Sequence, residues 1–225
     1  MILTEEQTMI RDMGRQFAQE QLAPNAADWD RNKTFPKEAL SAMGELGMLG
    51  MLVPGDYDGA GTDHVAYALC LEEIAAGDGS CSTIMSVHNS VGCMPILKFG
   101  SEEQKQDFLK PMARGEKLGA FCLTEPQAGS DASAIKTRAH KEGNKWVLNG
   151  TKQFITSGSN ADVAIVFAIT DPEAGKKGLS AFIVDADTPG FEVSEKIDVI
   201  APHPLGTLAF SDCVIPLENR LGGDG

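Results

Sequence analysis

The spacing of the apolar residues changes once along the chain, near residue 118, and this change restricts the fold more than any other feature. Before it, apolar residues recur three or four positions apart, as Ile10, Met13 and Phe17 do, which is typical of amphipathic helices. After it, short runs rich in β-branched and aromatic residues end at Gly, Pro or Asp, which is typical of strands. Helices followed by strands predict an α+β fold, with an all-α helical domain over residues 1–115 and an antiparallel β-barrel or β-sandwich domain over residues 116–225.

Two pairs of residues predict where helices begin. In a capping box, a Ser or Thr side chain accepts from the amide three residues later, and a Glu or Gln at that position bonds back to the capping residue. Thr4 with Gln7, and Ser101 with Gln104, have this spacing. We therefore expect one helix to start after Thr4 and another after Ser101.

Three prolines are expected to interrupt the helical half, because proline lacks the amide hydrogen and its ring clashes with the preceding helical turn. Pro24 should end the first helix or lie just past its end, and the helix that starts after Ser101 should stop near Pro111. An apolar helix over residues 82–98 should be interrupted near Pro95.

The second half contains five runs that are typical of strands. The run over residues 145–151 includes Asn149 and Gly150, a pair common in tight β-turns, so we expect a strand followed by a turn there. The other four runs cover residues 161–170, 178–185, 191–197 and 208–216.

The net charge argues against two classes of partner. Lys and Arg total 19 against 32 Asp and Glu, a formal net charge of −13. Nucleic acids and anionic membrane surfaces attract basic proteins, so we expect neither as a partner. The longest apolar run, residues 48–53, is far shorter than the roughly 20 residues that span a bilayer. No basic segment followed by an apolar one opens the chain, and we expect a cytoplasmic location.

The five cysteines are scattered and lack the spacing of a metal site. They are Cys70, Cys81, Cys93, Cys122 and Cys213. We expect them to be reduced, mostly buried, and to behave as small apolar side chains. A catalytic thiol is the less favoured alternative, since no His accompanies any of them in a known local pattern.

Two stretches could bind a ligand. The first, residues 121–131, ends a β-rich run at Thr124 and continues in small residues, whose exposed amides could cradle an oxygen-rich ligand. By composition alone, a tight loop whose Asp and Ser bond local backbone groups is the more frequent structure. The second, residues 153–158, combines an aromatic ring, a β-branched residue and a hydroxyl at a strand end. Its ordinary interpretation is a strand with a Phe in the core.

Together these stretches resemble the acyl-CoA dehydrogenases, the FAD-dependent flavoproteins of fatty-acid and branched-chain amino-acid oxidation. Residues 123–131 read LTEPQAGSD and residues 148–158 read LNGTKQFITSG, and both are similar to signatures of that family. Residues 210–222, FSDCVIPLENRLG, resemble the strand that leaves the family's middle domain. The resemblance covers essentially the whole chain and favours a ligand site at the first stretch. In this chain Phe154 replaces the usual Trp, and residues 200–207 lack the family's usual Arg and Ser.

The resemblance implies FAD as the cofactor and assigns roles to residues of both stretches. The backbone amides of Leu123 and Thr124, with the Thr124 hydroxyl, would bond the polar edge of the isoalloxazine ring. The turn at Gly129 and Ser130 would approach the pyrophosphate and the substrate's pantetheine. Thr156 would donate toward flavin N5 from the ring's other face. The implied cofactor-binding residues are Phe121, Leu123, Thr124, Gly129, Ser130, Phe154, Ile155 and Thr156, and Ser130 is also the implied substrate-binding residue.

The resemblance also implies a reaction: α,β-dehydrogenation of an acyl-CoA, with electrons passed to electron-transfer flavoprotein by a homo-oligomer, a tetramer when full length. In the family the base is a Glu of a C-terminal helical domain, which we expect beyond Gly225. No catalytic residue is therefore assigned, and the 225-residue chain alone is expected to be inactive. Glu125 is expected to bond backbone groups or a nearby cation.

The substrate and the chemistry have open alternatives. Residues 84–90 resemble the acyl-pocket helix of short- and branched-chain members, although Met85 and Val87 could equally be core residues. An acyl-CoA oxidase or flavin monooxygenase would share the fold, and a non-catalytic flavin- or acyl-CoA-binding module would belong to a different class. His203, between Pro202 and Pro204, is expected to be a surface loop residue, since an isolated His lacks the partners that an acid or base needs.

Overall fold

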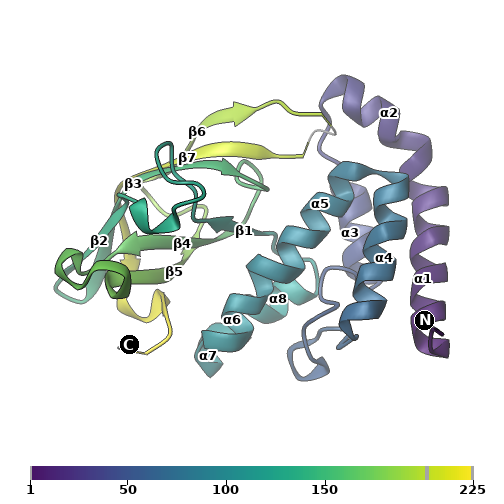
Figure 1. Ribbon diagram of the computed structural model, residues 1–225, viewed down its shortest axis with the longest axis horizontal. Coiled ribbons are helices and arrows are strands. Elements are labelled where there is room, and N and C mark those ends of the chain that lie inside the picture. The colour runs from purple at the N-terminus through teal and green to yellow at the C-terminus, as the bar shows by residue number, and fades with distance from the viewer. Residues whose placement is uncertain (1, 201–202, 224–225) are drawn as a thin grey trace.

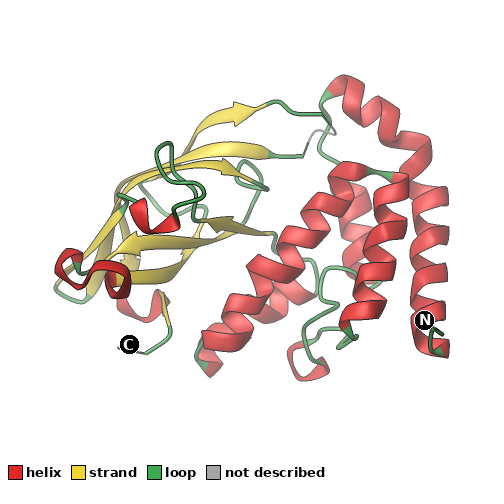
Figure 2. Ribbon diagram, in the orientation of Figure 1, coloured by secondary structure: helices red, strands yellow, loops and turns green. Residues whose placement is uncertain are grey.

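The computed structural model describes residues 2–200 and 203–223. Helices fill the first half and strands the second, as Figures 1 and 2 show, and the predicted α+β fold class is confirmed. No strand occurs among residues 2–118. The helices are α1 (Glu5–Phe17), α2 (Ala23–Asn32), α3 (Lys37–Glu45), α4 (His64–Gly77), α5 (Gly79–Val87), α6 (Met94–Phe99), α7 (Glu102–Gln104) and α8 (Lys110–Ala113).

Both predicted capping boxes are present. The Gln7 amide donates to the Thr4 hydroxyl and the Thr4 amide donates to the Gln7 side chain, each at 3.1 Å. Ser101 and Gln104 make the same reciprocal pair at 3.2 and 2.9 Å. These bonds satisfy amides that have no partner inside the helix and so fix the starts of α1 and α7.

Pro24, Pro95 and Pro111 each follow a short π-helical segment. Pro24 does not end the first helix, which continues to Asn32, so that prediction is wrong. Near Pro95 the α-helix is interrupted by the π-helical segment before the proline, although the chain stays helical to Phe99, and the helix end near Pro111 is observed at Ala113. The π-helical segments are Ala18–Leu22, His88–Cys93 and Lys105–Leu109. A π turn alters the local hydrogen-bond ladder, which lets a helix accommodate a residue without an amide hydrogen.

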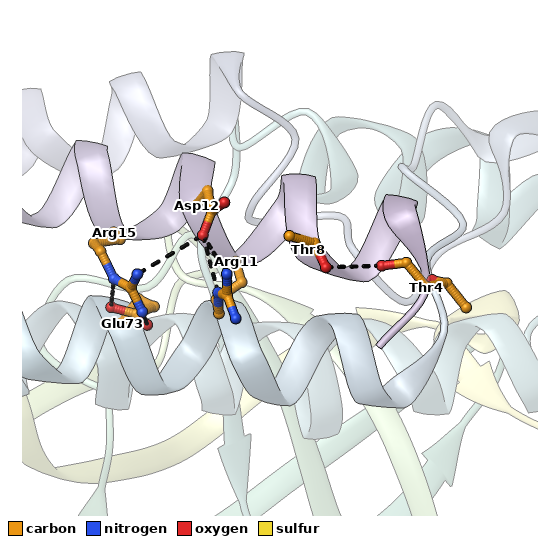
Figure 3. A network of polar contacts seen from close by, with 6 residues as sticks. All are labelled: Thr4, Thr8, Arg11, Asp12, Arg15 and Glu73. Carbon is orange, nitrogen blue, oxygen red and sulfur yellow. Dashed lines mark hydrogen bonds and ion pairs between the residues drawn. The ribbon is translucent and has the colours of Figure 1, made fainter. Parts of the chain in front are cut away.

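Helix α1 lies along α4 and is tied to it by charge as well as by packing (Figure 3). The Arg15 guanidinium donates to both carboxylate oxygens of Glu73, at 3.0 and 2.5 Å. Asp12 lies on the other side of Arg15, 3.8 Å away. A side chain at Gly14 would meet the Cys70 sulfur at 3.0 Å, so glycine allows this close approach of the two helices.

The strands form one sheet that bends over its own apolar core. Its order is β6-β7-β3-β2-β4-β5-β8, and β1 pairs with β4. Trp146 of β3 packs edge-to-face on Phe182 of β5, with 5.2 Å between the ring centroids, so opposite parts of the sheet share one core. The strands are β1 (Gly119–Cys122), β2 (Arg138–Glu142), β3 (Lys145–Ile155), β4 (Val163–Ile169), β5 (Leu179–Asp185), β6 (Phe191–Ile197), β7 (Leu205–Pro216) and β8 (Arg220–Leu221).

Two of the pairings are parallel, where only antiparallel ones were expected. β1 pairs with β4 in parallel over four residues, and Arg138 of β2 pairs with Ile169 of β4. Parallel neighbours need a long connection, and the β2–β3 hairpin between β1 and β4 supplies it. The other pairings are antiparallel.

Strand β3 passes straight through Asn149 and Gly150, so the predicted turn is wrong. The pairing with β7 shifts register between Leu148 and Gly150, which marks a bulge. Asn149 bonds twice across the sheet to Asp212, through its side-chain nitrogen at 3.1 Å and its oxygen at 2.9 Å. A side chain at Gly150 would meet the Thr137 hydroxyl at 2.3 Å. Contacts with other strands thus override the local turn signal.

One apolar cluster joins the helical half to the sheet. It contains Cys93 and Met112 from the helices with Ile165 and Ile183 from β4 and β5. The buried His88 accepts from the Gly119 amide at 3.0 Å through Nδ1 and lies 2.9 Å from the Met112 carbonyl oxygen through Nε2. Since the halves share a core, the division into two domains at residue 115 stays a prediction.

All five cysteines are buried and free, as expected. Burial raises the pKa of each thiol, that of Cys70 and Cys213 to about 11 and that of Cys122 to about 12, so none has the features of a reactive thiolate. Across the described residues, no three His, Cys, Asp or Glu side chains gather as metal ligands would. None of the helices in the described ranges has the length and apolar character to cross a membrane.

Candidate functional site

One buried ion pair joins the first of the two candidate stretches to the residue just before the second. Lys152 of β3 places its Nζ atom 2.8 Å from Oε1 of Glu125, and the two side chains are 0% and 2% exposed. The same ammonium donates to the carbonyl oxygen of Leu123 at 3.2 Å. The sequence analysis assigns Lys152 no role, and its signal is a Lys that shares the inward alternation of Trp146 and Leu148.

The Glu125 carboxylate is saturated with donors. Besides Lys152, it accepts from the amides of Lys136 at 2.6 Å and Thr137 at 3.0 Å, and from the Gln127 side chain at 2.7 Å. Burial alone would raise the pKa of this carboxyl, but the bonds from Lys152, Thr137 and Lys136 outweigh burial and lower the pKa to about 2. Glu125 therefore bonds both backbone and a cation, as expected, and it is poorly suited to accept a proton.

The backbone reinforces this junction and shapes the loop that follows. The Gln153 amide donates to the Thr124 carbonyl at 2.9 Å. Glu125 and Ala128 exchange two backbone bonds, at 2.9 and 3.0 Å, which close a tight turn. Gly129 and Ser130 follow this turn and are exposed, so the loop is open to a ligand.

A bulge in β3 turns the Phe154 ring out of the core. Lys152 pairs with Leu208 and Ile155 with Gly206, so β3 has one extra residue in this interval. Phe154 adopts a φ of 57° and is 57% exposed, whereas strict alternation would bury it on the same face as Lys152. The ordinary interpretation, a strand with this Phe in the core, is therefore wrong.

The three residues after Phe154 differ in what they can offer a ligand. The Ile155 side chain lies in the core of the sheet, so only its backbone could face a bound group. Thr156 is half-buried. Ser157 is fully buried with a φ of 63°, and its hydroxyl has no hydrogen-bond partner in the described structure. Left-handed backbone at two non-glycine residues indicates local strain, which concentrates at functional sites.

A cleft of about 630 Å³ opens beside Leu123. Phe167 lines this cleft and packs edge-to-face on Phe121, with 5.0 Å between the ring centroids. This contact fixes the orientation of the Phe121 ring. Lys176 and Arg220 also line the cleft. Asp131 lines the same cleft, so two cations and one carboxylate lie beside apolar side chains. This net positive lining suits an anionic ligand with an apolar portion.

The residues proposed from sequence for the acyl pocket separate in the structure. Met85 is fully buried in the helical core. Val87 instead lines a groove of about 460 Å³ between α4 and α5, together with Ala68, Leu71 and Ala75. Met85 is thus a core residue, and Val87 lies on an open apolar face.

His203 lines a cavity to which neither Lys152 nor Glu125 contributes. It is half-buried and shares this cavity of about 230 Å³ with Lys196 and Phe35. Ala201 and Pro202, which precede it in the sequence, lie outside the described residues. Its expected role as a loop residue on the surface stays a prediction.

Comparison with known families gives matches over most of the chain. Residues 4–116 match the model of the acyl-CoA dehydrogenase N-terminal domain. Residues 120–213 match that of the acyl-CoA dehydrogenase middle domain.

Individual relatives agree with these matches. The chain is 47% identical over 225 residues to the short-chain specific acyl-CoA dehydrogenase of Rattus norvegicus, covering 99% of this chain and 55% of the relative. It superimposes on butyryl-CoA dehydrogenase from Megasphaera elsdenii with a TM-score of 0.95 and 39% identity, covering 100% of this chain and 60% of that one. A glutaryl-CoA dehydrogenase from Mycobacterium smegmatis in complex with FADH2 gives a TM-score of 0.91 at 38% identity. This match covers 98% of this chain and 56% of that one.

The chain thus spans between 55% and 60% of the length of these relatives. The two matched models follow each other in chain order and together cover well over half of the sequence. The chain belongs to the acyl-CoA dehydrogenase family.

Proposed function

We propose that this protein binds FAD and dehydrogenates short- or branched-chain acyl-CoA thioesters between the α and β carbons, passing the electrons to an electron-transfer flavoprotein. The observation that carries the proposal is the junction of the two family motifs at Lys152 and Glu125. The relatives support a short chain, since one is named short-chain specific and another butyryl-CoA dehydrogenase.

A planar aromatic cofactor fits the residues at this junction. The Phe154 ring is exposed and held outward by a left-handed backbone, an arrangement that offers an apolar surface for a ring to cover. The Leu123–Thr124 segment would bond the polar edge of the flavin, and Gly129 with Ser130 would approach its pyrophosphate. The bound flavin would supply the hydride acceptor of the reaction.

The role of Thr156 follows from where negative charge develops on the flavin as it is reduced. A hydroxyl aimed at N5 would stabilise the negative charge that accumulates on the ring during reduction. Thr156 is half-buried, so water would compete weakly for this bond, and the strained Ser157 next to it would limit its movement.

The cleft beside Leu123 supports a phosphate-bearing substrate. Lys176 and Arg220 would attract the phosphates of coenzyme A, and Phe167 and Leu179 would contact its less polar part. Asp131 lines this cleft, and Ser130 directly precedes it in the sequence. Ser130 would therefore contact both the cofactor and the substrate.

The base that removes the α-proton is proposed to lie beyond residue 225. Glu125 is unsuitable because Lys152 and two backbone amides hold its proton affinity low. A homotetramer and a cytoplasmic location stay predictions.

The test uses the full-length gene product. Anaerobic addition of a series of acyl-CoAs should bleach the bound flavin, most rapidly with short or branched chains. Electron transfer to electron-transfer flavoprotein but not to oxygen would support a dehydrogenase. Rapid reoxidation by oxygen would instead favour an oxidase or a monooxygenase, and binding without bleaching would favour a non-catalytic module.

A further inference from the structure

The buried ion pair occupies the place where the proposed flavin site is assembled. Glu125 directly follows the segment that would bond the flavin edge, and Lys152 is two residues before Phe154, which would cover one face of the ring. The Lys152 ammonium reaches both Oε1 of Glu125 and the carbonyl oxygen of Leu123. One cation therefore connects the two segments directly.

The environment makes this connection stiff. Both side chains are almost completely removed from solvent, so water cannot replace a lost bond, and a displaced partner would leave a buried charge unpaired. The neighbouring backbone bond from Gln153 to Thr124 keeps the same two segments in register.

The bulge after Lys152 explains why the ion pair that holds the strand is formed at this residue. Lys152 and Ile155 both point inward, while Phe154 between them points out. The inward Lys fixes the strand just before the point where the bulge re-aims the aromatic ring.

We propose that Lys152 and Glu125 are positioning residues, whose ion pair sets the placement of Leu123–Thr124 relative to Phe154–Thr156 and thereby the affinity and environment of the flavin. This inference rests on the proposed function. A pair that served stability alone could be exchanged for apolar residues of similar size with little effect, or with a gain in stability.

That contrast defines the experiment. In the full-length gene product, the double variant Lys152→Met with Glu125→Leu is compared with the parent by urea unfolding, FAD titration and the visible spectrum of bound FAD. We expect an unfolding midpoint close to that of the parent, a Kd for FAD raised by about tenfold or more, and a shifted flavin spectrum. A double variant that binds FAD with the parent's Kd and spectrum would overturn the inference and leave the proposed function standing.

A second variant covers the case in which the double variant does not fold. Glu125→Gln keeps the size of the side chain and removes its charge, so it should weaken FAD binding and change the flavin spectrum while leaving the circular dichroism spectrum unchanged. An unchanged Kd and spectrum in this folded variant would again overturn the inference. A parent protein that shows no saturable FAD binding would overturn the proposed function as well.

The matched control is the ion pair between α1 and α4 (Figure 3). Arg15→Met with Glu73→Leu also removes an ion pair, a bidentate one that lies in the helical half. Its Kd for FAD should stay within about twofold of the parent. An equal loss of FAD affinity in this control would mean that ion-pair removal acts through general destabilisation and would overturn the inference.

Discussion

Lys152 Nζ lies 2.8 Å from Glu125 Oε1, although the two residues are 27 positions apart in the sequence. This contact joins the loop after β1 to the end of β3. It places in one buried network two segments that resemble separate signatures of the acyl-CoA dehydrogenases and that both lie within the match to the family's middle domain.

The ion pair predicts a loss of stability in acid. The pKa of Glu125 falls from 4.5 to about 2 on folding, so the unfolded chain binds this proton first as the pH falls. The contribution of Glu125 is complete above about pH 4.5 and is lost as the pH falls through about 2, at most about 3 kcal/mol in the free energy of unfolding. Urea unfolding of the parent and of Glu125→Gln between about pH 6 and pH 3 measures the difference. A parallel decline in both proteins would contradict the assignment.

His88 predicts a second pH effect in a higher range. Burial lowers its pKa from 6.5 to about 4, although the bond to Met112 opposes the shift. The Gly119 amide donates to Nδ1, so this nitrogen carries no proton and the Nε2 hydrogen donates to the Met112 carbonyl.

Acid should therefore weaken the fold through His88. Between about pH 6.5 and pH 4 the unfolded chain binds a proton that the folded chain does not, so the free energy of unfolding decreases as the pH falls, by about 3 kcal/mol in total. His88→Gln should remove this slope, as measured by urea unfolding at about pH 7.5 and pH 5. A slope that persists in the variant would show that other groups cause it.

The outward placement of Phe154 predicts that replacing two different phenylalanines by alanine will lower the free energy of unfolding by very different amounts. Phe154→Ala should change the free energy of unfolding by less than about 0.5 kcal/mol, because the ring is largely exposed. Phe182→Ala should cost about 3–5 kcal/mol, because Phe182 is fully buried and packs on Trp146. FAD titration should show weaker binding for Phe154→Ala. Unfolding losses of equal size for the two variants would contradict the outward placement of Phe154.

Thr156→Ala tests the donor toward flavin N5. A single hydrogen bond to a charged partner is worth about 1.5–3 kcal/mol, so flavin reduction should slow by roughly ten- to a hundredfold. FAD affinity should fall less, because the proposed contacts at Thr124 and Ser130 are kept. Stopped-flow bleaching at saturating acyl-CoA, beside an FAD titration, separates the two effects. Reduction at the parent rate with collapsed FAD binding would make Thr156 a structural residue.

Local signals in the sequence predict the parts of the fold that local bonds decide. The capping boxes at Thr4 and Ser101 form as expected, because their capping bonds join residues only three positions apart. The change from helical to alternating spacing near residue 118 likewise predicts where the strands begin.

Contacts between distant residues decide what the sequence did not predict. Asn149 and Gly150 are typical of a turn, but Asp212 of β7 bonds Asn149 and keeps β3 extended. The helix continues past Pro24 because a π-helical segment precedes this proline. Neither local spacing nor propensity predicts that segment.

The candidate site also combines features that the local sequence predicts with features that contacts between distant residues decide. Glu125 was expected to bond backbone or a cation, yet which cation depends on how β3 lies against the loop after β1. The exposure of Phe154 depends on a bulge that only its pairing with β7 reveals, since regular alternation would bury the ring.

The central claim is that the segments joined by Lys152 and Glu125 form the flavin site of an acyl-CoA dehydrogenase. Its most direct test is the anaerobic titration of the FAD-loaded, full-length gene product with butyryl-CoA, followed by the visible absorbance of the flavin. The account predicts saturable FAD binding and bleaching of the flavin by butyryl-CoA. A full-length protein that binds no FAD, or whose bound FAD keeps its oxidised spectrum with every acyl-CoA tried, would contradict it.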